Sequence, residues 1–150
     1  MKPGQEVAIE VTVENQGNHT EMFNVTAYAD TTIIDILTDI TLTSGNSTTI
    51  GFAWNTTAFG NYTISAYASP VPNETDVFDN TFIDSWVIVT IPGDVDEDND
   101  VDIFDIAVIA DICGVSNPNP KYDPNCDIDG DGDIDVIDIV IAAGNYGQSL

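Results

Sequence analysis

Basic residues are almost absent from this chain, which has 2 lysine and arginine residues against 26 aspartate and glutamate residues and a formal net charge of -24. A surface that binds phosphates needs many basic side chains, so nucleic acid is excluded as a partner and attraction to an anionic membrane is disfavoured. No apolar run is long enough to span a bilayer, so we expect no membrane insertion, and the N-terminus lacks the apolar core of a signal peptide. Cations are the partners that this charge favours.

Histidine is nearly absent too, because His19 is the only one and it lies inside a glycosylation sequon. No nucleophile lies at a plausible spacing from a base, and the carboxylates that could do acid-base work fall in segments that we assign to ions below. We therefore predict that the chain is not an enzyme.

Cysteine occurs only at Cys113 and Cys126, separated by the loop-like segment GVSNPNPKYDPN. Neither has a nearby histidine or the CxxC spacing of a metal or redox site. We predict a disulfide, which would stabilise the fold by about 3 kcal/mol and would suit an oxidising exterior. Two unrelated buried thiols are the alternative.

Glycosylation sequons are frequent in the first half of the chain. Six N-x-S/T motifs precede residue 76, several on the polar phase of strand-like sequence, and they indicate an extracellular or cell-surface glycoprotein. Their asparagines are Asn18, Asn24, Asn46, Asn55, Asn61 and Asn73.

The first 91 residues alternate apolar and polar side chains with period two, as in EVAIEVTVE at residues 6–14. Turn-forming clusters separate the runs, and no helical period occurs among them, which predicts an antiparallel sandwich. Trp54 falls on the apolar phase, so we assign it to core packing in preference to a sugar-stacking platform. The predicted strands span residues 6–14, 22–30, 32–42 with a break near 38–39, 48–54, 61–68 and 81–91.

Two short acidic segments dominate the remainder. GDVDEDNDVDIFD at residues 93–105 returns as DIDGDGDIDVID at residues 127–138, aligned at one constant offset that pairs Asp94 with Asp127, and the two segments hold half of all the acids. Acids at every second position and again at the twelfth are typical of a loop around a hard cation. All-oxygen ligands favour calcium over zinc or copper, and magnesium would take fewer protein ligands. An acidic solvated run is the alternative.

We predict two Ca2+ ions, one per loop. Positions 1, 3 and 5 would supply side-chain oxygens, position 7 its carbonyl, position 9 a water-mediated contact and position 12 a carboxylate. Position 6 needs a positive φ, which suits Gly132 and, next best, Asn99. The predicted ligands are Asp94, Asp96, Asp98, Asp100, Asp102 and Asp105, then Asp127, Asp129, Asp131, Asp133, Asp135 and Asp138.

A helix is predicted after each loop, ending near Gly114 and Gly144. Helical spacing predicts one buried face per helix, so that the two helices pack on each other. The predicted faces are Ile103, Ile106, Ile109 and Ala110, then Val136, Ile139, Val140 and Ala143.

The first half resembles the CARDB type of immunoglobulin-like repeat of archaeal and bacterial surface proteins, through PGQEVAIEVTVENQGN, SGNSTTIGFAWNTT, GNYTISAYA and DVFDNTFIDSWVIVTIP. The resemblance implies a spacer or adhesion module. The family normally has a further strand before PGQEV, and this sequence lacks it. We therefore expect an unpaired edge of the sheet, where another chain could add a strand.

The second half resembles a dockerin domain, through GDVDEDNDVDIFDIAVIADICG and CDIDGDGDIDVIDIVIAAGNYG. The resemblance implies docking onto a cohesin-like partner, with partner-choosing residues at loop positions 10 and 11. Those positions are Ile103, Phe104, Val136 and Ile137, which suggest a more apolar interface than the hydroxyl residues common in cellulosomal relatives.

The predicted architecture is thus an all-β immunoglobulin-like sandwich at residues 1–91 and a small all-α dockerin-like module with two EF-hand-like calcium loops at residues 92–150. The predicted function is an extracellular calcium-dependent protein-interaction module with the sandwich as spacer. The alternative is a structural subunit of a calcium-stabilised surface assembly, self-associating through the open β edge.

Overall fold

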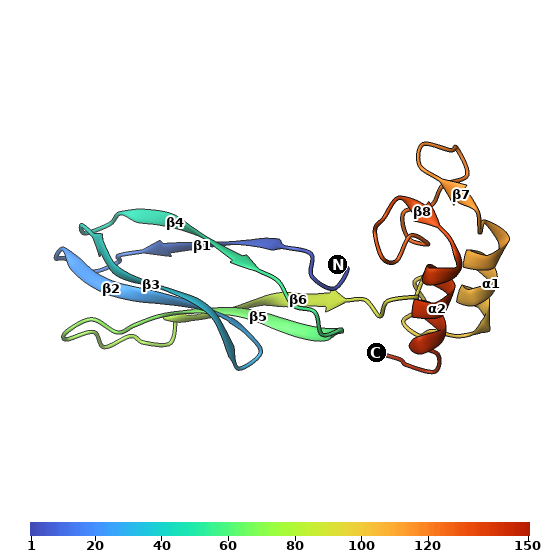
Figure 1. Cartoon of the computed structure of the whole chain (residues 1–150). Coiled ribbons are helices and arrows are strands. Elements are labelled where there is room, and N and C mark those ends of the chain that lie inside the picture. The colour runs from blue at the N-terminus through green and yellow to red at the C-terminus, as the bar shows by residue number, and fades with distance from the viewer. The chain divides into compact units, whose positions relative to one another are not determined.

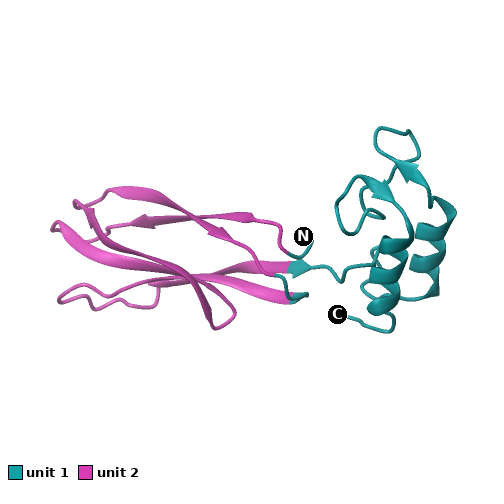
Figure 2. Cartoon of the chain, in the orientation of Figure 1, with its two compact units in different colours: residues 1–3, 57–60, 88–150 teal, residues 4–56, 61–87 magenta.

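The computed structural model describes residues 1–150 and divides into two compact units (Figure 2). Unit 2 comprises residues 4–56 and 61–87, and unit 1 comprises residues 1–3, 57–60 and 88–150. The domain limits drawn from the sequence, 1–91 and 92–150, stay predictions.

Unit 2 contains two antiparallel sheets (Figure 1). In the smaller sheet β1 (Val7–Glu14) pairs with β4 (Ser47–Trp54). The larger sheet has the order β3-β2-β5-β6, with β3 at Thr32–Leu42, β2 at Glu21–Ala29, β5 at Gly60–Ala68 and β6 at Thr81–Val89. Each predicted strand is present, because alternation of apolar and polar residues places one side of each sheet in a common core.

The core of unit 2 comes from the apolar phase of the strands. Phe23, Val25 and Ala27 of β2 are buried together with Ile50 and Phe52 of β4. Trp54 is also buried and meets the ring of Tyr62 edge-on, with 5.1 Å between ring centroids. The prediction that Trp54 is a core residue is therefore confirmed.

β3 is continuous, although a break was predicted near residues 38–39. Its register with β2 shifts between the pairs Phe23–Ile40 and Val25–Leu37, so two residues of β3 face one of β2. Asp39 takes a positive φ of 59° at this bulge, and its N–H donates to Asn24 Oδ1 at 3.0 Å. The turn-forming residues thus make a β-bulge and do not end the strand.

The helices of unit 1 are short: α1 spans Ile103–Asp111 and α2 spans Val136–Gly144, nine residues each. Each begins with a capping box, formed by Asp102 with Asp105 in α1 and by Asp135 with Asp138 in α2. No helix in the structure has the length and apolarity needed to cross a membrane.

The predicted helix faces are partly wrong. Ile109 and Ala142 are fully buried, and Ile106 and Ile139 pack beside them. Ile103, Val136 and Val140 are instead exposed, as are Ala110 and Ala143. The reason is that Asp105 and Asp138 point inward, which turns residues one and four places after each aspartate toward the core.

The prediction of an all-α C-terminal module is wrong. Unit 1 also contains an antiparallel pair, β7 (Val115–Ser116) with β8 (Asp133–Ile134), and an isolated antiparallel bridge between Asp100 and Ser149. With only two short helices against six main strands, the regular structure of the chain is mostly β. Nine-residue helices are marginal alone, so backbone pairing between segments contributes to this unit.

The predicted disulfide is absent, because Cys113 and Cys126 are both free. Cys126 is buried in the apolar cluster of Val95, Ile109, Ile134 and Ala142, whereas Cys113 is exposed after the end of α1. Burial, with the nearby Asp123 and Asp138 charges, raises the pKa of the Cys126 thiol to about 11. Cys126 is thus an unreactive core side chain.

Candidate metal centre

The first acidic loop brings carboxylates together around Asp105. Oxygens of Asp94, Asp96 and Asp105 lie within 4.8 Å of one another. A second group, Asp100, Asp102 and Asp105, meets the same criterion, so Asp105 belongs to both. Asp98, also a predicted ligand, is exposed and belongs to neither group. Five of the six predicted residues of this loop therefore belong to one or both of two groups that share Asp105.

The sequence did not predict a role for the carboxylate of Asp100. Position 7 of such a loop was expected to supply only its carbonyl oxygen. In the structure its carboxylate faces Asp102 and Asp105, with a buried Oδ1 that has no hydrogen-bond partner. The acidic identity of Asp100 was the signal that could have suggested this role.

The second loop gathers Asp127, Asp129 and Asp131, again within 4.8 Å. Asp133, at the same loop position as Asp100, is exposed and stays outside the group, as does Asp135. Three of the six predicted ligands of this loop come together in the structure.

Asp105 and Asp138 organise the two loops in the same way. Asp105 Oδ1 accepts from Val95 N–H at 2.8 Å and Asp96 N–H at 3.3 Å, while Oδ2 accepts from Asp102 N–H at 2.8 Å. In the second loop, Asp138 accepts from the equivalent N–H groups of Ile128 at 2.7 Å, Asp129 at 3.4 Å and Asp135 at 2.8 Å. Both side chains are buried, so each ties the two ends of its loop to the first turn of a helix.

Like charges perturb the first loop. Burial raises the pKa of Asp94, and the Asp105 and Asp98 carboxylates raise it further. Desolvation followed by repulsion from neighbouring aspartates also raises the pKa values of Asp96 and Asp100. These carboxylates therefore lie close together and repel one another, and no positively charged side chain lies among them.

The second loop differs at its first ligand. Burial opposes ionisation of Asp127, but hydrogen bonds from Tyr122 and from the N–H groups of Gly132 and Gly130 outweigh it and lower the pKa. The same bond to Asp127 raises the pKa of Tyr122 to about 12. The pKa of Asp129 is raised by desolvation and by the Asp131 charge, as are the pKa values of the aspartates in the first loop.

The residues present fit a hard divalent cation. Asp94 Oδ1 and Asp100 Oδ1 are buried oxygens without hydrogen-bond partners, and such atoms are costly unless something positive faces them. Every converging group is a carboxylate, and neither histidine nor cysteine joins them. This donor set suits a metal that prefers oxygen.

The two loops have positive φ angles at matching positions of the repeat. Gly132 and Asn99 have the predicted positive φ, at 94° and 74°. Gly130 and its counterpart Glu97 are also left-handed, at 78° and 64°, which the sequence analysis missed. Gly130 was the available signal, since a glycine there marks a position with unusual φ.

Reciprocal pairing joins the two loops. Gly114, after α1, donates its N–H to the Ile134 carbonyl of the second loop at 2.6 Å. Gly147, after α2, donates its N–H to the Val101 carbonyl of the first loop at 2.8 Å. In the repeat, Gly147 corresponds to Gly114 and Val101 corresponds to Ile134. Each helix therefore leads into a segment that holds the opposite loop.

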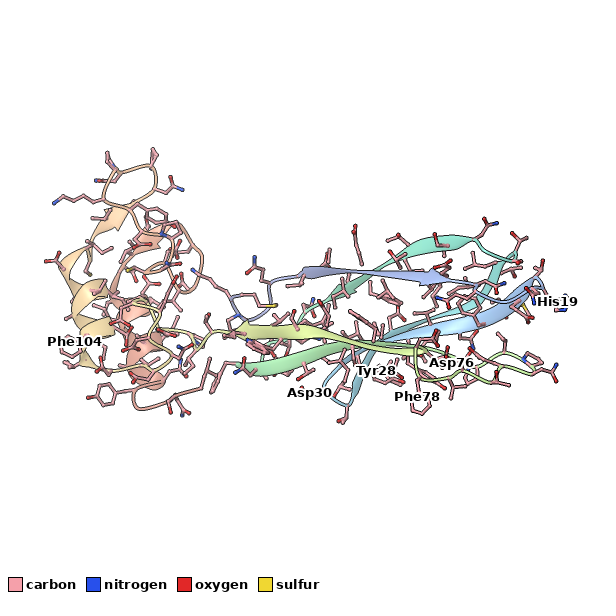
Figure 3. The ribbon with its side chains drawn as sticks, turned by 180° about the vertical axis from the view of Figure 1, so that it is seen from behind. His19, Tyr28, Asp30, Asp76, Phe78 and Phe104 are labelled. Carbon is pink, nitrogen blue, oxygen red and sulfur yellow. The ribbon has the colours of Figure 1, made fainter.

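The predicted partner-binding residues lie on the surface of the helices. Ile103 and Val136 are about equally exposed, and at the next position Phe104 is more exposed than Ile137. Phe104 projects from α1 (Figure 3), and Val140 of α2 is exposed as well. Clustered apolar exposure of this kind is typical of interaction surfaces.

The sequon asparagines are mostly accessible. Asn18, Asn46, Asn55, Asn61 and Asn73 are exposed. Asn24 is half-buried, and its side-chain oxygen holds the β3 bulge.

The sequence matches the CARDB family over residues 1–84, more than half of the chain. The chain belongs to the CARDB family. CARDB domains are non-catalytic modules of surface proteins. No curated protein matches the chain.

The fold of one solved structure agrees with this assignment. The CARDB domain of the PF1109 protein from Pyrococcus furiosus, solved in complex with di-metal ions, is 24% identical with a TM-score of 0.53 and covers 59% of this chain and 81% of its own. At that identity the similarity shows the CARDB fold alone, and it lends no support to an all-α dockerin module. The 272–376 domain of a protein assigned to the cell surface of Methanosarcina acetivorans is 32% identical, with a TM-score of 0.45, and covers 53% of this chain and 73% of its own.

A type II cohesin–X–dockerin complex from Acetivibrio cellulolyticus also matches. It covers 95% of this chain and 96% of its own, at 17% identity and a TM-score of 0.36. A score that low carries no weight for fold or function.

Proposed function

We propose that this CARDB protein is an extracellular, calcium-dependent protein-interaction module, in which the sandwich is a spacer and the duplicated loop-helix unit docks onto a cohesin-like or other surface partner. The observation that carries the proposal is the matched hydrogen bonding of Asp105 and Asp138, each buried and each bound to three backbone N–H groups, together with the carboxylates that gather beside Asp105 and around Asp127. A merely solvated acidic run would leave its carboxylates in water.

The aspartates of each loop would hold one Ca2+, which supplies the positive charge that the crowded carboxylates lack. Calcium accepts six to eight oxygens in flexible geometry, whereas magnesium requires stricter geometry and keeps more of its water. Because loop and helix share Asp105 or Asp138, holding an ion in the loop also fixes the first turn of the helix.

The docking surface is proposed to be the exposed apolar side of α1 and α2. Ile103 with Phe104, and Val136 with Ile137, start the two helices at equivalent positions. Since each pair follows directly on its loop, the order of the loops sets the position of these side chains. A partner with an apolar surface would match them.

Calcium titration of the full chain tests the metal part. Calorimetry is expected to find two sites, and the variant Asp127→Asn with Asp138→Asn is expected to retain one. Addition of EGTA should destabilise unit 1 and weaken the helical far-UV signal, while the β signal persists, because the loops then carry unrelieved repulsion. A helical signal that EGTA leaves unchanged contradicts the calcium assignment.

Capture of surface proteins tests the docking part. The immobilised chain should retain a partner in excess calcium and release it in EGTA. Phe104→Ser with Ile137→Ser should abolish retention, whereas Phe78→Ser, at a 92% exposed residue of unit 2, is the matched control. Equal retention by both variants contradicts the proposed surface.

A further inference from the structure

The outer face of the larger sheet contains a groove over its two inner strands. The groove has a volume of about 490 Å³. Because the strand order is β3-β2-β5-β6, strands β2 and β5 are paired on both sides, and the groove does not depend on what pairs with either edge of the sheet. Its lining includes Tyr28, Asp30, Thr31, Ser65, Tyr67 and Thr81.

Two tyrosines of neighbouring strands stand on this face. Tyr28 of β2 and Tyr67 of β5 each follow a buried alanine, so their side chains point away from the core. Tyr28 pairs with Ser65, which makes Tyr67 its diagonal neighbour at a typical separation of about 7–8 Å. Neither ring stacks on another aromatic ring, and neither hydroxyl is hydrogen-bonded within the chain. Both rings are therefore free to contact a ligand.

Asp30 adds a fixed carboxylate to the lining. Asp30 and Tyr28 lie on the side of the larger sheet that faces away from β1 and β4 (Figure 3). Asp30 follows β2 with a φ of 52°, its N–H donates to the Thr63 carbonyl at 2.8 Å, and its Oδ1 accepts from the Thr63 N–H at 2.8 Å. Its Oδ2 accepts no hydrogen bond from the chain. The backbone thus positions one oxygen and leaves the other available to a ligand.

No basic side chain of this unit neutralises the groove. Both basic residues of the chain, Lys2 and Lys121, belong to unit 1, and unit 2 contains neither lysine nor arginine. A ligand that brings positive charge therefore complements Asp30, whereas an anion would meet repulsion. A hard metal ion would need several converging oxygens of the kind found in the acidic loops, and Asp30 is the only carboxylate in this lining.

We infer that this groove binds a small organic cation with a methylated ammonium group, held between the rings of Tyr28 and Tyr67 and beside Asp30. An ammonium surrounded by methyl groups spreads its charge over an apolar surface, which the negative faces of aromatic rings attract. The hydroxyls of Ser65 and Thr81 can bind polar groups elsewhere on the ligand. The site lies in unit 2 and involves neither the acidic loops nor the helices, so it goes beyond the docking proposed above.

Titration of the full, unglycosylated and isotope-labelled chain with choline tests the inference by NMR. In excess calcium, which competes for the acidic loops, choline should shift the amide signals of residues 28–31 and 65–67, with saturation in the millimolar range. The comparison compound is the alcohol of the same shape in which a tert-butyl group replaces the trimethylammonium group. It lacks only the charge, so it should bind about tenfold more weakly.

Single substitutions separate the contributions of the carboxylate and the rings. Asp30→Asn keeps an acceptor for the Thr63 N–H and tolerates the positive φ, so the loss of charge alone should weaken choline binding about threefold. Tyr28→Leu should weaken it by a similar factor, whereas Tyr28→Phe keeps a ring and should change it by less than about twofold. Asp35→Asn is the matched control, since Asp35 is an exposed acid of β3 outside the groove.

Four outcomes overturn the inference. They are the absence of saturable shifts at these amides, equal affinity for choline and the neutral alcohol, equal weakening by Asp30→Asn and Asp35→Asn, and a neutral saccharide that shifts the same amides at lower concentration than choline. The last outcome would show that hydroxyl groups, and not charge, select the ligand. All four measurements concern unit 2, so they do not depend on the calcium titration.

Discussion

The two acidic loops have nearly the same sequence pattern but differ in how their first aspartate is satisfied. Asp127 accepts hydrogen bonds from Gly130, Gly132 and Tyr122, and its pKa is lowered. Asp94, its equivalent in the first loop, keeps a buried oxygen without a partner, and its pKa is raised. Asp94 also accepts backbone hydrogen bonds from Glu97 and Asn99, the counterparts of Gly130 and Gly132, so the Tyr122 bond to Asp127 and the unpartnered oxygen of Asp94 are what distinguish the two loops. The duplicated sequence thus gives two loops whose first aspartates have pKa values shifted in opposite directions.

The largest expected effect comes from the buried helix-starting aspartates. Asp105→Ala and Asp138→Ala each leave three backbone N–H groups without an acceptor, so each should cost about 3 kcal/mol of unfolding free energy in calcium. In EGTA, Asp105→Ala should cost less than Asp138→Ala, because Asp105 repels Asp94, Asp96 and Asp100. Urea unfolding in both buffers measures this difference.

Exposed Asp111 of α1 provides the control, since Asp111→Ala removes a charge without disturbing either loop. Equal losses for Asp105→Ala and Asp138→Ala in EGTA would contradict the stronger repulsion around Asp105.

Glycine at the start of the first loop makes a closer contact than the glycine within the second. A Cβ on Gly93 would lie 2.7 Å from Ala142 Cα and 2.9 Å from its Cβ. A Cβ on Gly132 would meet nothing within 4 Å, although its φ is also positive. Gly93→Ala should therefore cost about 2 kcal/mol and Gly132→Ala about 1 kcal/mol. Thermal unfolding in calcium measures both, and a larger loss for Gly132→Ala would contradict the close packing of Gly93 on α2.

A swap of left-handed residues should make the loops more alike. Glu97 has a φ of 64° where the second loop has Gly130, so Glu97→Gly should stabilise unit 1 by about 1 kcal/mol, and Gly130→Glu should destabilise it by a similar amount. Glu97→Gln is the control, because it removes the charge and keeps the Cβ. If Glu97→Gln stabilised unit 1 as much as Glu97→Gly, the charge of Glu97 and not its backbone strain would account for the effect.

Local patterns predicted much of this structure. The strands follow from alternation, as in residues 7–14, and the two helices follow from capping aspartates before apolar runs. The helix faces could not be read from apolar spacing, because the inward aspartates Asp105 and Asp138 fix the rotation of each helix. Pairing of Gly147 with Val101 links distant segments, and no local pattern specifies it. The disulfide prediction was wrong because the composition of the segment between the two cysteines does not show that Cys126 is buried in the core.

The smallest expected effect concerns Tyr122, whose hydroxyl donates to Asp127 and whose counterpart before the first loop is Val89. Tyr122→Phe should raise the pKa of Asp127 toward its ordinary value and reduce stability in EGTA by about 1 kcal/mol at neutral pH. A lowered carboxyl pKa contributes stability above the pKa of the unfolded chain, and this contribution disappears as pH falls through the pKa of the folded state. The difference between wild type and Tyr122→Phe should therefore decrease as the pH falls below the ordinary aspartate pKa, and it should vanish only below the lowered pKa of folded Asp127.

Chemical unfolding at neutral pH and at about pH 3, below the ordinary aspartate pKa, tests this expectation. Tyr146→Phe is the matched control, since Tyr146 is an exposed tyrosine of the same unit. The backbone N–H groups of Gly130 and Gly132 still bind Asp127 in the variant, so only the contribution of the hydroxyl should be lost. If Tyr122→Phe instead made calcium binding at both loops equally weak, the hydroxyl alone would account for the difference between them.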